Sequence, residues 1–195
     1  LDVGCGTGYG CKAFLDAGAT RATGIDQSTD AIRYAQRTYR DPGLEFRGMD
    51  AHHLEFPDAH FDVAMSTENL EHLQDPEKNV SEIRRVLRPN GLLVLGTPNK
   101  EVSSPGMETC PNRYHIKEFY FEELDGLLRK HFARVHIFEN SLPSPHEYGR
   151  ELHADRRRRG AIGLEPGSEA TIELSERTVH LEHLHNTHSF LALAW

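Results

Sequence analysis

The stretch Leu1-Asp2-Val3-Gly4-Cys5-Gly6-Thr7-Gly8 indicates both the fold of the chain and the kind of ligand it can hold. Its first three residues are typical of a buried strand, and a helical pattern begins near Gly8. Glycines between a strand and a helix let backbone N–H groups approach a ligand, and the N-terminus of the helix favours electronegative atoms. The stretch therefore predicts a site for a nucleotide-like molecule.

The spacing of these glycines excludes two common nucleotide loops. Gly4, Gly6 and Gly8 follow the pattern G-x-G-x-G, whereas the dinucleotide pattern G-x-G-x-x-G needs a glycine where Tyr9 or Cys11 stands. A P-loop needs Gly-Lys-Ser or Gly-Lys-Thr, which the chain lacks here. The spacing thus disfavours a nicotinamide oxidoreductase and a P-loop protein.

Acidic residues follow the next two predicted strands. Gly24-Ile25-Asp26 ends the second strand, so Asp26 lies beside the glycine loop, where a carboxylate can accept hydrogen bonds from both ribose hydroxyls. Met49-Asp50-Ala51 follows the third strand at the same edge. Together the loop and the two acids predict a cradle for adenosine.

Short apolar runs alternate with helical patterns, which predicts an α/β fold with a parallel sheet covered on both faces. Strands are expected at Leu1–Val3, Ala22–Asp26, Leu44–Gly48, Phe61–Ser66, Leu92–Thr97, Ala133–Phe138 and Ser189–Trp195. Helices are expected from near Gly8, at Thr29–Tyr39 behind the N-cap Ser28, at Pro76–Leu87 and at Lys117–Lys130, with turns at Asp41-Pro42-Gly43 and Asn90-Gly91. Residues 98–113 are expected to form a loop over the site, and residues 139–185 an insertion without sustained periodicity.

Length and composition limit the class of protein. A chain of 195 residues predicts a single domain, 1–195. The net charge of -8 disfavours a nucleic-acid partner, and the run Arg156–Arg159 is interpreted as a solvated loop.

No apolar run approaches the ~20 residues of a membrane span. Three cysteines without zinc-like spacing fit a reducing compartment. Cytoplasmic localisation is the default expectation. Because the chain opens within a strand, we expect it to be N-terminally incomplete.

With these motifs in place, the sequence resembles the class I S-adenosylmethionine-dependent methyltransferases, specifically the branch whose first motif reads Leu-Asp-Val-Gly-Cys-Gly-Thr-Gly. The resemblance covers nearly the whole chain and implies a Rossmann-like, doubly wound seven-stranded sheet, mostly parallel with an antiparallel last strand. It implies S-adenosylmethionine as cofactor and S-adenosylhomocysteine as product. The glycine loop would border the methionine part, Asp26 the ribose, Gln27 the sugar or base, and Asp50 with Ala51 the adenine. The implied cofactor residues are Asp2, Gly4, Cys5, Gly6, Thr7, Gly8, Asp26, Gln27, Asp50, Ala51 and Glu68.

Glu68, Glu71 and His72 follow the fourth strand, at the edge where ligands of doubly wound folds bind. In a helical turn they would project from one face, since they are three and four residues apart. Such a set suits Mg²⁺ or Mn²⁺, or a general base that orients an acceptor, and an exposed polar turn is an equal alternative. The sequence leaves these open.

His115 is the preferred catalytic base and His72 the second candidate. The segment around His115 follows the loose loop and can fold back over the same edge, and a histidine is mostly neutral at pH 7, ready to accept a hydroxyl proton. A histidine that bonds only to the backbone is the alternative. The four histidines His180, His183, His185 and His188 have mixed spacing and are interpreted as solvent-facing or core residues.

The resemblance extends to several branches of the family. Gly96–Asn99 and Asn112–Phe119 resemble O-methyltransferases of glycan, cell-envelope, quinone and natural-product pathways, whose acceptors are small molecules, saccharides or lipid-linked hydroxyls. They also resemble small-RNA terminal 2′-O-methyltransferases, in which a Glu-x-x-Glu-His element and a later histidine hold a divalent metal. That pattern falls on Glu68, Glu71, His72 and His115, although the net charge disfavours RNA. A non-catalytic module that binds the cofactor is the third hypothesis, and the oligomeric state is left open.

Overall fold

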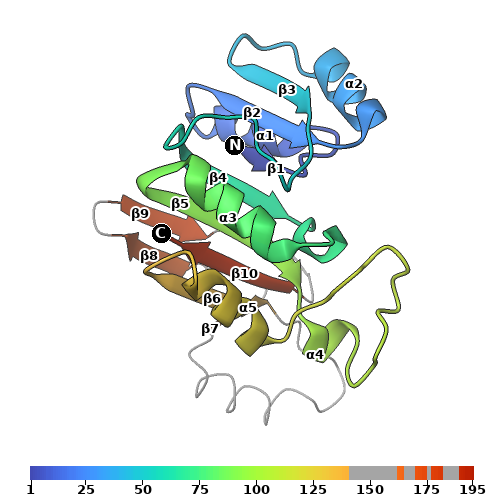
Figure 1. Ribbon diagram of the computed structural model, residues 1–195. Helices are drawn as coiled ribbons and strands as arrows, with labels where there is room; N and C mark the ends of the chain where they lie inside the picture. Colours follow the sequence, from blue (N-terminus) through green and yellow to red (C-terminus); the bar gives the residue numbers. More distant parts are fainter. Residues whose placement is uncertain (141–161, 165–169, 175–176, 182–188) are drawn as a thin grey trace.

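A mixed sheet of eight strands lies at the centre of the computed structural model, which describes residues 1–140, 162–164, 170–174, 177–181 and 189–195 (Figure 1). The strand order is β3-β2-β1-β4-β5-β10-β6-β7. Its strands are β1 (Asp2–Val3), β2 (Ala22–Asp26), β3 (Leu44–Gly48), β4 (Phe61–Thr67), β5 (Leu87–Pro98), β6 (Val135–Asn140), β7 (Ile162–Leu164) and β10 (Ser189–Ala194). The pairs from β3 to β5 are parallel, and β10 lies antiparallel between β5 and β6. The predicted seven-stranded sheet with an antiparallel last strand is confirmed, and β7 adds a short strand beside β6.

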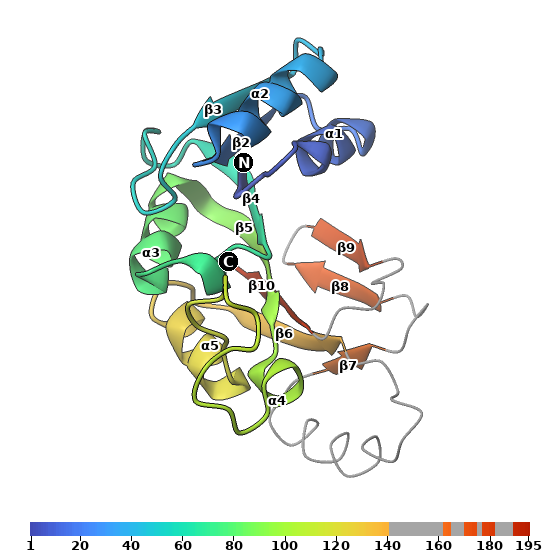
Figure 2. The ribbon, with the colours of Figure 1, turned by 90° about the vertical axis from the view of Figure 1, so that its right-hand side faces the viewer.

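Helices cover both faces of this sheet. They are α1 (Tyr9–Asp16), α2 (Thr29–Thr38), η1 (Leu70–His72, a 3₁₀ turn), α3 (Pro76–Val86), α4 (Lys100–Ser103) and α5 (Phe121–Arg129). Helices α1 and α2 share one apolar cluster with β2 and β3, which includes Cys11, Ile32 and Phe46. Helices α3 and α5 pack on a second cluster on the other side of the sheet, where Figure 2 shows them opposite α1. No helix in the described part of the chain is long and apolar enough to cross a membrane.

Capping residues set where the helices begin. The Ser28 hydroxyl accepts a hydrogen bond from the Ala31 N–H at 3.3 Å, which places the start of α2 where the sequence predicted it. Asp75 caps α3 in the same way, because its carboxylate accepts from the Lys78 N–H at 2.9 Å and Pro76 occupies the first turn.

Helix α5 begins later than predicted. The expected helix started at Lys117, but residues 117–119 are not helical, and Phe119 forms a bridge with Asn99. The Lys100 N–H donates to the Phe119 carbonyl at 2.9 Å. This long-range pairing competes with the local helical pattern, so α5 starts only at Phe121, behind Tyr120.

Two further predictions at the end of α3 and after β5 are corrected. Asn90-Gly91 does not separate helix from strand: β5 starts at Leu87, which pairs with Phe61, and the extra residues form an irregularity at which Asn90 has φ +60°. Within the predicted loop 98–113, residues 100–103 form the short helix α4, with the Asn99 side chain as its cap.

The predicted insertion, residues 139–185, contains described strands. These are β7, β8 (Ala170–Leu174) and β9 (Arg177–Leu181), and β8 pairs with β9 in an antiparallel hairpin. Arg156–Arg159, His183, His185 and His188 lie outside the described residues, and only the backbone of His180 is described. The single domain remains a prediction.

A charged pair on α3, the buried Glu82 and the half-buried Arg85, fastens the loop after β3. The carboxylate of Glu82 accepts from the Leu54 N–H at 3.0 Å and from the Arg85 guanidinium at 2.7 Å. Arg85 in turn donates to the carbonyl oxygens of Leu54 and Phe56. The hydrogen bond from Arg85 to the Glu82 carboxylate, helped by that from the Leu54 N–H, lowers the pKa of Glu82 to about 2. The loop is therefore fixed to α3 by an ionised carboxylate.

We predict that Glu82→Gln destabilises the fold by about 2 kcal/mol at pH 7. The folded-state pKa lies below the unfolded value of about 4.3, so the stabilisation is complete above pH ~5 and is lost as the pH falls toward 2. Urea unfolding at several pH values should show the difference between wild type and variant shrinking on acidification. Glu45→Gln, which removes an exposed pair with Arg47, is the control and should change stability by under about 0.5 kcal/mol. A difference that does not vary with pH would contradict this account.

Candidate functional site

A pocket of about 720 Å³ opens at the carboxyl ends of the parallel strands, where the chain order reverses between β1 and β4. We call it the main pocket. It is lined by Gly4, Asp26, Gln27, Met49, Asp50, Ala51, His52, Glu68, Asn69, His72, Leu73, Gln74, Tyr114 and Ile116. Six predicted cofactor residues are therefore among its walls, namely Gly4, Asp26, Gln27, Asp50, Ala51 and Glu68. The other five do not line it: Asp2 lies in β1, and Cys5, Gly6, Thr7 and Gly8 lie in the adjoining loop.

Asp26 holds the glycine loop in shape. Its Oδ2 accepts from the Gly6 N–H at 2.9 Å, and its Oδ1 accepts from the Ser28 N–H at 2.8 Å. Each carboxylate oxygen keeps a further lone pair for a ligand hydroxyl. Asp26 thus joins the loop after β1 to the main pocket.

Two glycines of the loop are required by close packing. Gly4 has φ +76°, and a Cβ there would lie 2.6 Å from the Asn69 side-chain oxygen. Gly8 has φ +87°, and a Cβ there would lie 2.6 Å from the Phe46 ring. Both positions combine a left-handed backbone with no room for a side chain.

Asp2 lies beneath the loop. It is 3% exposed, its Oδ2 accepts a weak hydrogen bond from the Cys11 thiol at 3.7 Å, and burial raises its pKa to about 6. A Cβ on Gly10 would meet this carboxylate at 2.5 Å. Asp2 therefore packs against α1 in the described structure.

Glu71 is a fully buried carboxylate behind the main pocket. Its Oε2 accepts from the Thr97 hydroxyl at 2.9 Å, whereas its Oε1 has no hydrogen-bond partner. Burial raises the pKa of this group. The backbone carbonyl of Glu71 also accepts from the N–H groups of Ile116 and Lys117, at 2.7 and 3.1 Å. These bonds bring the segment 112–118 over the pocket, as the sequence predicted.

His72 presents one free ring nitrogen at the pocket. Its Nδ1 lies 2.8 Å from the Tyr114 carbonyl oxygen, which fixes the proton on Nδ1. Its Nε2 is thereby left as an acceptor, 3.8 Å from the Glu71 Oε1. The side chain is 37% exposed and lines the main pocket.

His115, the preferred base from the sequence, is more enclosed. Its Nδ1 lies 2.7 Å from Glu118 Oε1 and its Nε2 lies 2.8 Å from Asn112 Nδ2, so both ring nitrogens have partners. The ring packs against His72 with centroids 5.0 Å apart.

Glu118 is buried beneath His115. It accepts hydrogen bonds from the hydroxyls of Ser103 and Ser104 as well as from His115. Burial acts to raise the pKa of Glu118, but these bonds outweigh it and hold the pKa below its ordinary value. An ionised carboxylate therefore orients the His115 ring.

The expected common face of Glu68, Glu71 and His72 is not formed. Glu68 has φ +50° and precedes the 3₁₀ turn, and its carboxylate accepts from the Ser189 hydroxyl at 3.2 Å. Glu71 and His72 instead converge with His115, and one donor atom from each lies within 4.8 Å of the others. We call these three residues the acceptor cluster.

Several lining residues were not foreseen. Met49, His52, Asn69, Leu73, Gln74, Tyr114 and Ile116 line the main pocket but were not among the predicted site residues. The predicted site residues do include their neighbours Asp50, Glu68, His72 and His115. The sequence therefore found the segments that form the pocket, although not every residue in them. The individual side chains depend on how each loop turns, which has no periodic signal.

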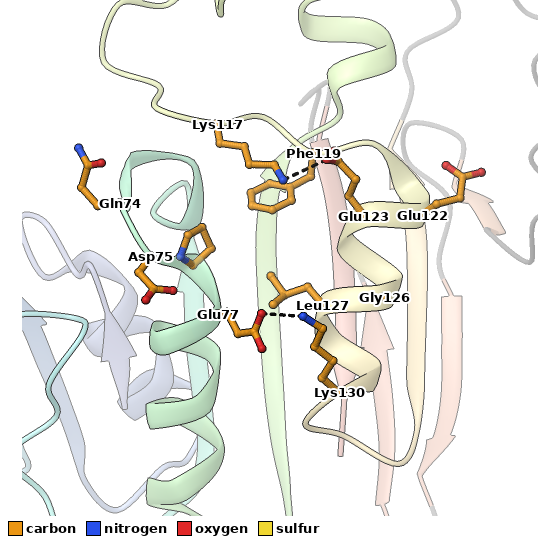
Figure 3. A pocket seen from close by; sticks show the side chains of 11 residues that line it. Gln74, Asp75, Glu77, Lys117, Phe119, Glu122, Glu123, Gly126, Leu127 and Lys130 are labelled. Carbon is orange, nitrogen blue, oxygen red and sulfur yellow. Dashed lines mark hydrogen bonds and ion pairs between the residues drawn. The ribbon is translucent and has the colours of Figure 1, made fainter.

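A smaller hollow of about 480 Å³ lies between α3 and α5 (Figure 3). Its charged residues pair with one another, since Lys117 lies 3.0 Å from Glu123 and Lys130 lies 2.6 Å from Glu77. It shares only Gln74 with the main pocket. With its charges satisfied and no glycine loop, this hollow is a poor candidate for the nucleotide.

Comparison with known proteins agrees with this geometry. Residues 1–95 match the family model described as a methyltransferase domain. A probable S-adenosylmethionine-dependent methyltransferase of Mycolicibacterium smegmatis is 38% identical over 128 residues, which are 66% of this chain and 49% of that protein. Residues 1–95 of this chain therefore carry a methyltransferase domain, and the chain is similar to S-adenosylmethionine-dependent methyltransferases.

One further relative and one solved structure carry more specific names. The 27-O-demethylrifamycin SV methyltransferase of Amycolatopsis mediterranei is 36% identical over 117 residues, covering 58% of this chain and 43% of that protein. The crystal structure of the [4+2]-cyclase SpnF superposes with a TM-score of 0.60 at 30% identity, over 70% of this chain and 51% of that one. The matches thus span about half the length of these relatives.

Proposed function

We propose that this chain transfers a methyl group from S-adenosylmethionine to a hydroxyl of a small-molecule or saccharide acceptor. The main support is that a single pocket runs from Asp26 and Asp50 to the free Nε2 of His72. Adenosine would occupy the acidic end, and the acceptor would enter beside His72. The name of one relative, 27-O-demethylrifamycin SV methyltransferase, also supports methyl transfer to an oxygen atom.

The proposed transfer is an in-line displacement. The acceptor oxygen forms a bond to the methyl carbon as the bond from that carbon to sulfur breaks, and the electron pair remains on sulfur in S-adenosylhomocysteine. The hydroxyl proton passes to His72 Nε2, the nitrogen that bears no hydrogen. His115, with both nitrogens bonded, would position the His72 ring. Segment 112–118 would help to exclude water.

The acceptor cluster favours a second arrangement, in which it holds a divalent cation such as Mg²⁺ or Mn²⁺. The buried Glu71 Oε1 without a partner suits a cation, and two imidazoles with a carboxylate suit Mn²⁺ better than Mg²⁺. Tyr114 holds Nδ1 of His72 and Glu118 holds Nδ1 of His115, as carbonyl and carboxylate partners do in metal-binding histidines. Nε2 of His115 would have to exchange its Asn112 partner for the ion. Such an ion would make a bound hydroxyl more acidic. Glu68, the fourth candidate, bonds to Ser189 instead.

The test is transfer of tritiated methyl from S-adenosylmethionine to hydroxylated aromatic, saccharide and fatty-acid acceptors, with EDTA or with added Mn²⁺. We expect a methylated product from a free hydroxyl and none from the corresponding methyl ether. Activity unchanged by EDTA would assign the proton to His72 alone, whereas loss on chelation and recovery with Mn²⁺ would assign the cation. Cofactor binding without any methylated product would refute methyl transfer and leave a binding module. A steep loss of activity with salt on an RNA substrate would favour the RNA alternative.

A further inference from the structure

The loop after β3 is held to α3 by contacts close to the main pocket. His52 Nε2 accepts from the Asp75 N–H at 3.3 Å, and the Asn79 amide donates to the Ala51 carbonyl at 2.8 Å. Asp75 is the N-cap of α3 and Asn79 lies in its first turns, so both contacts hold the loop to the start of this helix. Loop residues 50–52 are thus fixed before any ligand binds.

His52 also holds the side chain of Asp50. Its backbone N–H and its ring Nδ1 both contact Asp50 Oδ1, at 2.9 and 2.8 Å. Because Nε2 accepts a hydrogen bond, the ring proton is on Nδ1 and is donated to the carboxylate. His52 therefore connects Asp50 to the start of α3 through one neutral ring.

Asp50 keeps one oxygen for a ligand. Among the described residues Oδ2 has no hydrogen-bond partner, and Asp50 lines the main pocket. The hydrogen bonds from the His52 backbone and ring lower the pKa of Asp50, so it remains an acceptor at neutral pH. An ionised carboxylate accepts hydrogen bonds and cannot donate them, so it favours an exocyclic amine over a carbonyl oxygen.

We infer that His52 is a positioning residue that makes the pocket select an adenine base over a hypoxanthine base. Adenine carries an amino group where hypoxanthine carries a carbonyl, and only the amino group can donate to Asp50 Oδ2. His52 fixes the carboxylate so that this oxygen faces the base, which reduces the cost of ordering it on binding. This inference rests on the proposed function, since it places the adenine end of the cofactor at Asp50.

The experiment measures the Kd of S-adenosylhomocysteine and of its inosine counterpart by calorimetry. We expect wild type to bind the adenine compound about 10–100-fold more tightly, as for a hydrogen bond to a charged group. In His52→Leu the ratio should fall below about threefold, and His52→Asn, which retains a donor, should recover part of it. His53→Leu is the matched control, because His53 is an exposed neighbour outside the pocket, and it should keep the wild-type ratio.

The outcomes separate this inference from the proposed function. If wild type binds neither compound, both proposals fail. If wild type binds the adenine compound but His52→Leu keeps the full ratio, the inference fails and the proposed function stands. If His52→Leu does not fold, His52→Asn and His52→Ala replace it. The inference fails if both variants keep the wild-type ratio of the two Kd values. A lost ratio with kcat retained at saturating cofactor supports positioning rather than catalysis.

Discussion

Replacement of His72 by alanine is expected to lower kcat by about 10²–10⁴-fold, the usual contribution of a general base. The free Nε2 of His72 lies in the main pocket, and no other described ring nitrogen there is both unprotonated and unpartnered. The affinity for S-adenosylmethionine should change by less than about threefold, since Asp26 and Asp50 are untouched. Steady-state kinetics and calorimetry on the same preparation measure the two effects.

His60→Ala is the control for this variant, because His60 is exposed beside Phe56 and Phe61 and lies outside the main pocket. It should retain the wild-type kcat. A variant that keeps kcat within about threefold of wild type would remove His72 from the mechanism, in either its proton-accepting or its metal-binding form.

Asp26→Ala is expected to raise the Kd for S-adenosylhomocysteine at least about 100-fold. Two hydrogen bonds from ribose hydroxyls to a carboxylate account for a loss of this size, because each bond to a charged group is worth about 1.5–3 kcal/mol. The substitution also frees the N–H groups of Gly6 and Ser28, so the glycine loop is less well ordered. Calorimetric titration of the folded variant gives the Kd.

Two further variants make this result specific to Asp26. Asp26→Asn keeps an acceptor oxygen and should lose less affinity than alanine. Asp30→Ala, on the exposed side of α2, should bind as wild type does. A Kd within about threefold of wild type for Asp26→Ala would show that the nucleoside lies elsewhere, and would contradict the proposed placement of the cofactor.

Predictions from the sequence were most accurate where the signal is local. The bounds of β2 and β3 agree with the predicted ranges, and α2 and α3 begin behind Ser28 and Asp75. Hydrophobic alternation, caps and glycine turns involve residues a few positions apart, so they can be read along the chain. Errors arose where distant segments pair. The start of α5 and of β5 each depended on a partner strand or bridge far away in sequence.

The acceptor cluster shows the same division. The sequence identified Glu71, His72 and His115 as candidates, but it grouped Glu68 with them and preferred His115 as base. The structure directs Glu68 toward Ser189 and gives both nitrogens of His115 a partner. No spacing rule reveals which nitrogen of a histidine is occupied, because the partners of His72 and His115 come from several elements.

The sequence alone determined the α/β fold, the glycine loop, and the acidic residues at the ends of β2 and β3, because short-range patterns encode strands, turns and the order in which they meet the sheet edge. Only the tertiary structure decided which side chains face one another. Glu71 became a buried carboxylate with an unpartnered oxygen, His72 received its proton on Nδ1, and His52 joined Asp50 to α3. The physical reason is that burial and hydrogen-bond pairing between residues tens of positions apart depend on how the sheet and its helices pack, and chain order does not specify that packing locally.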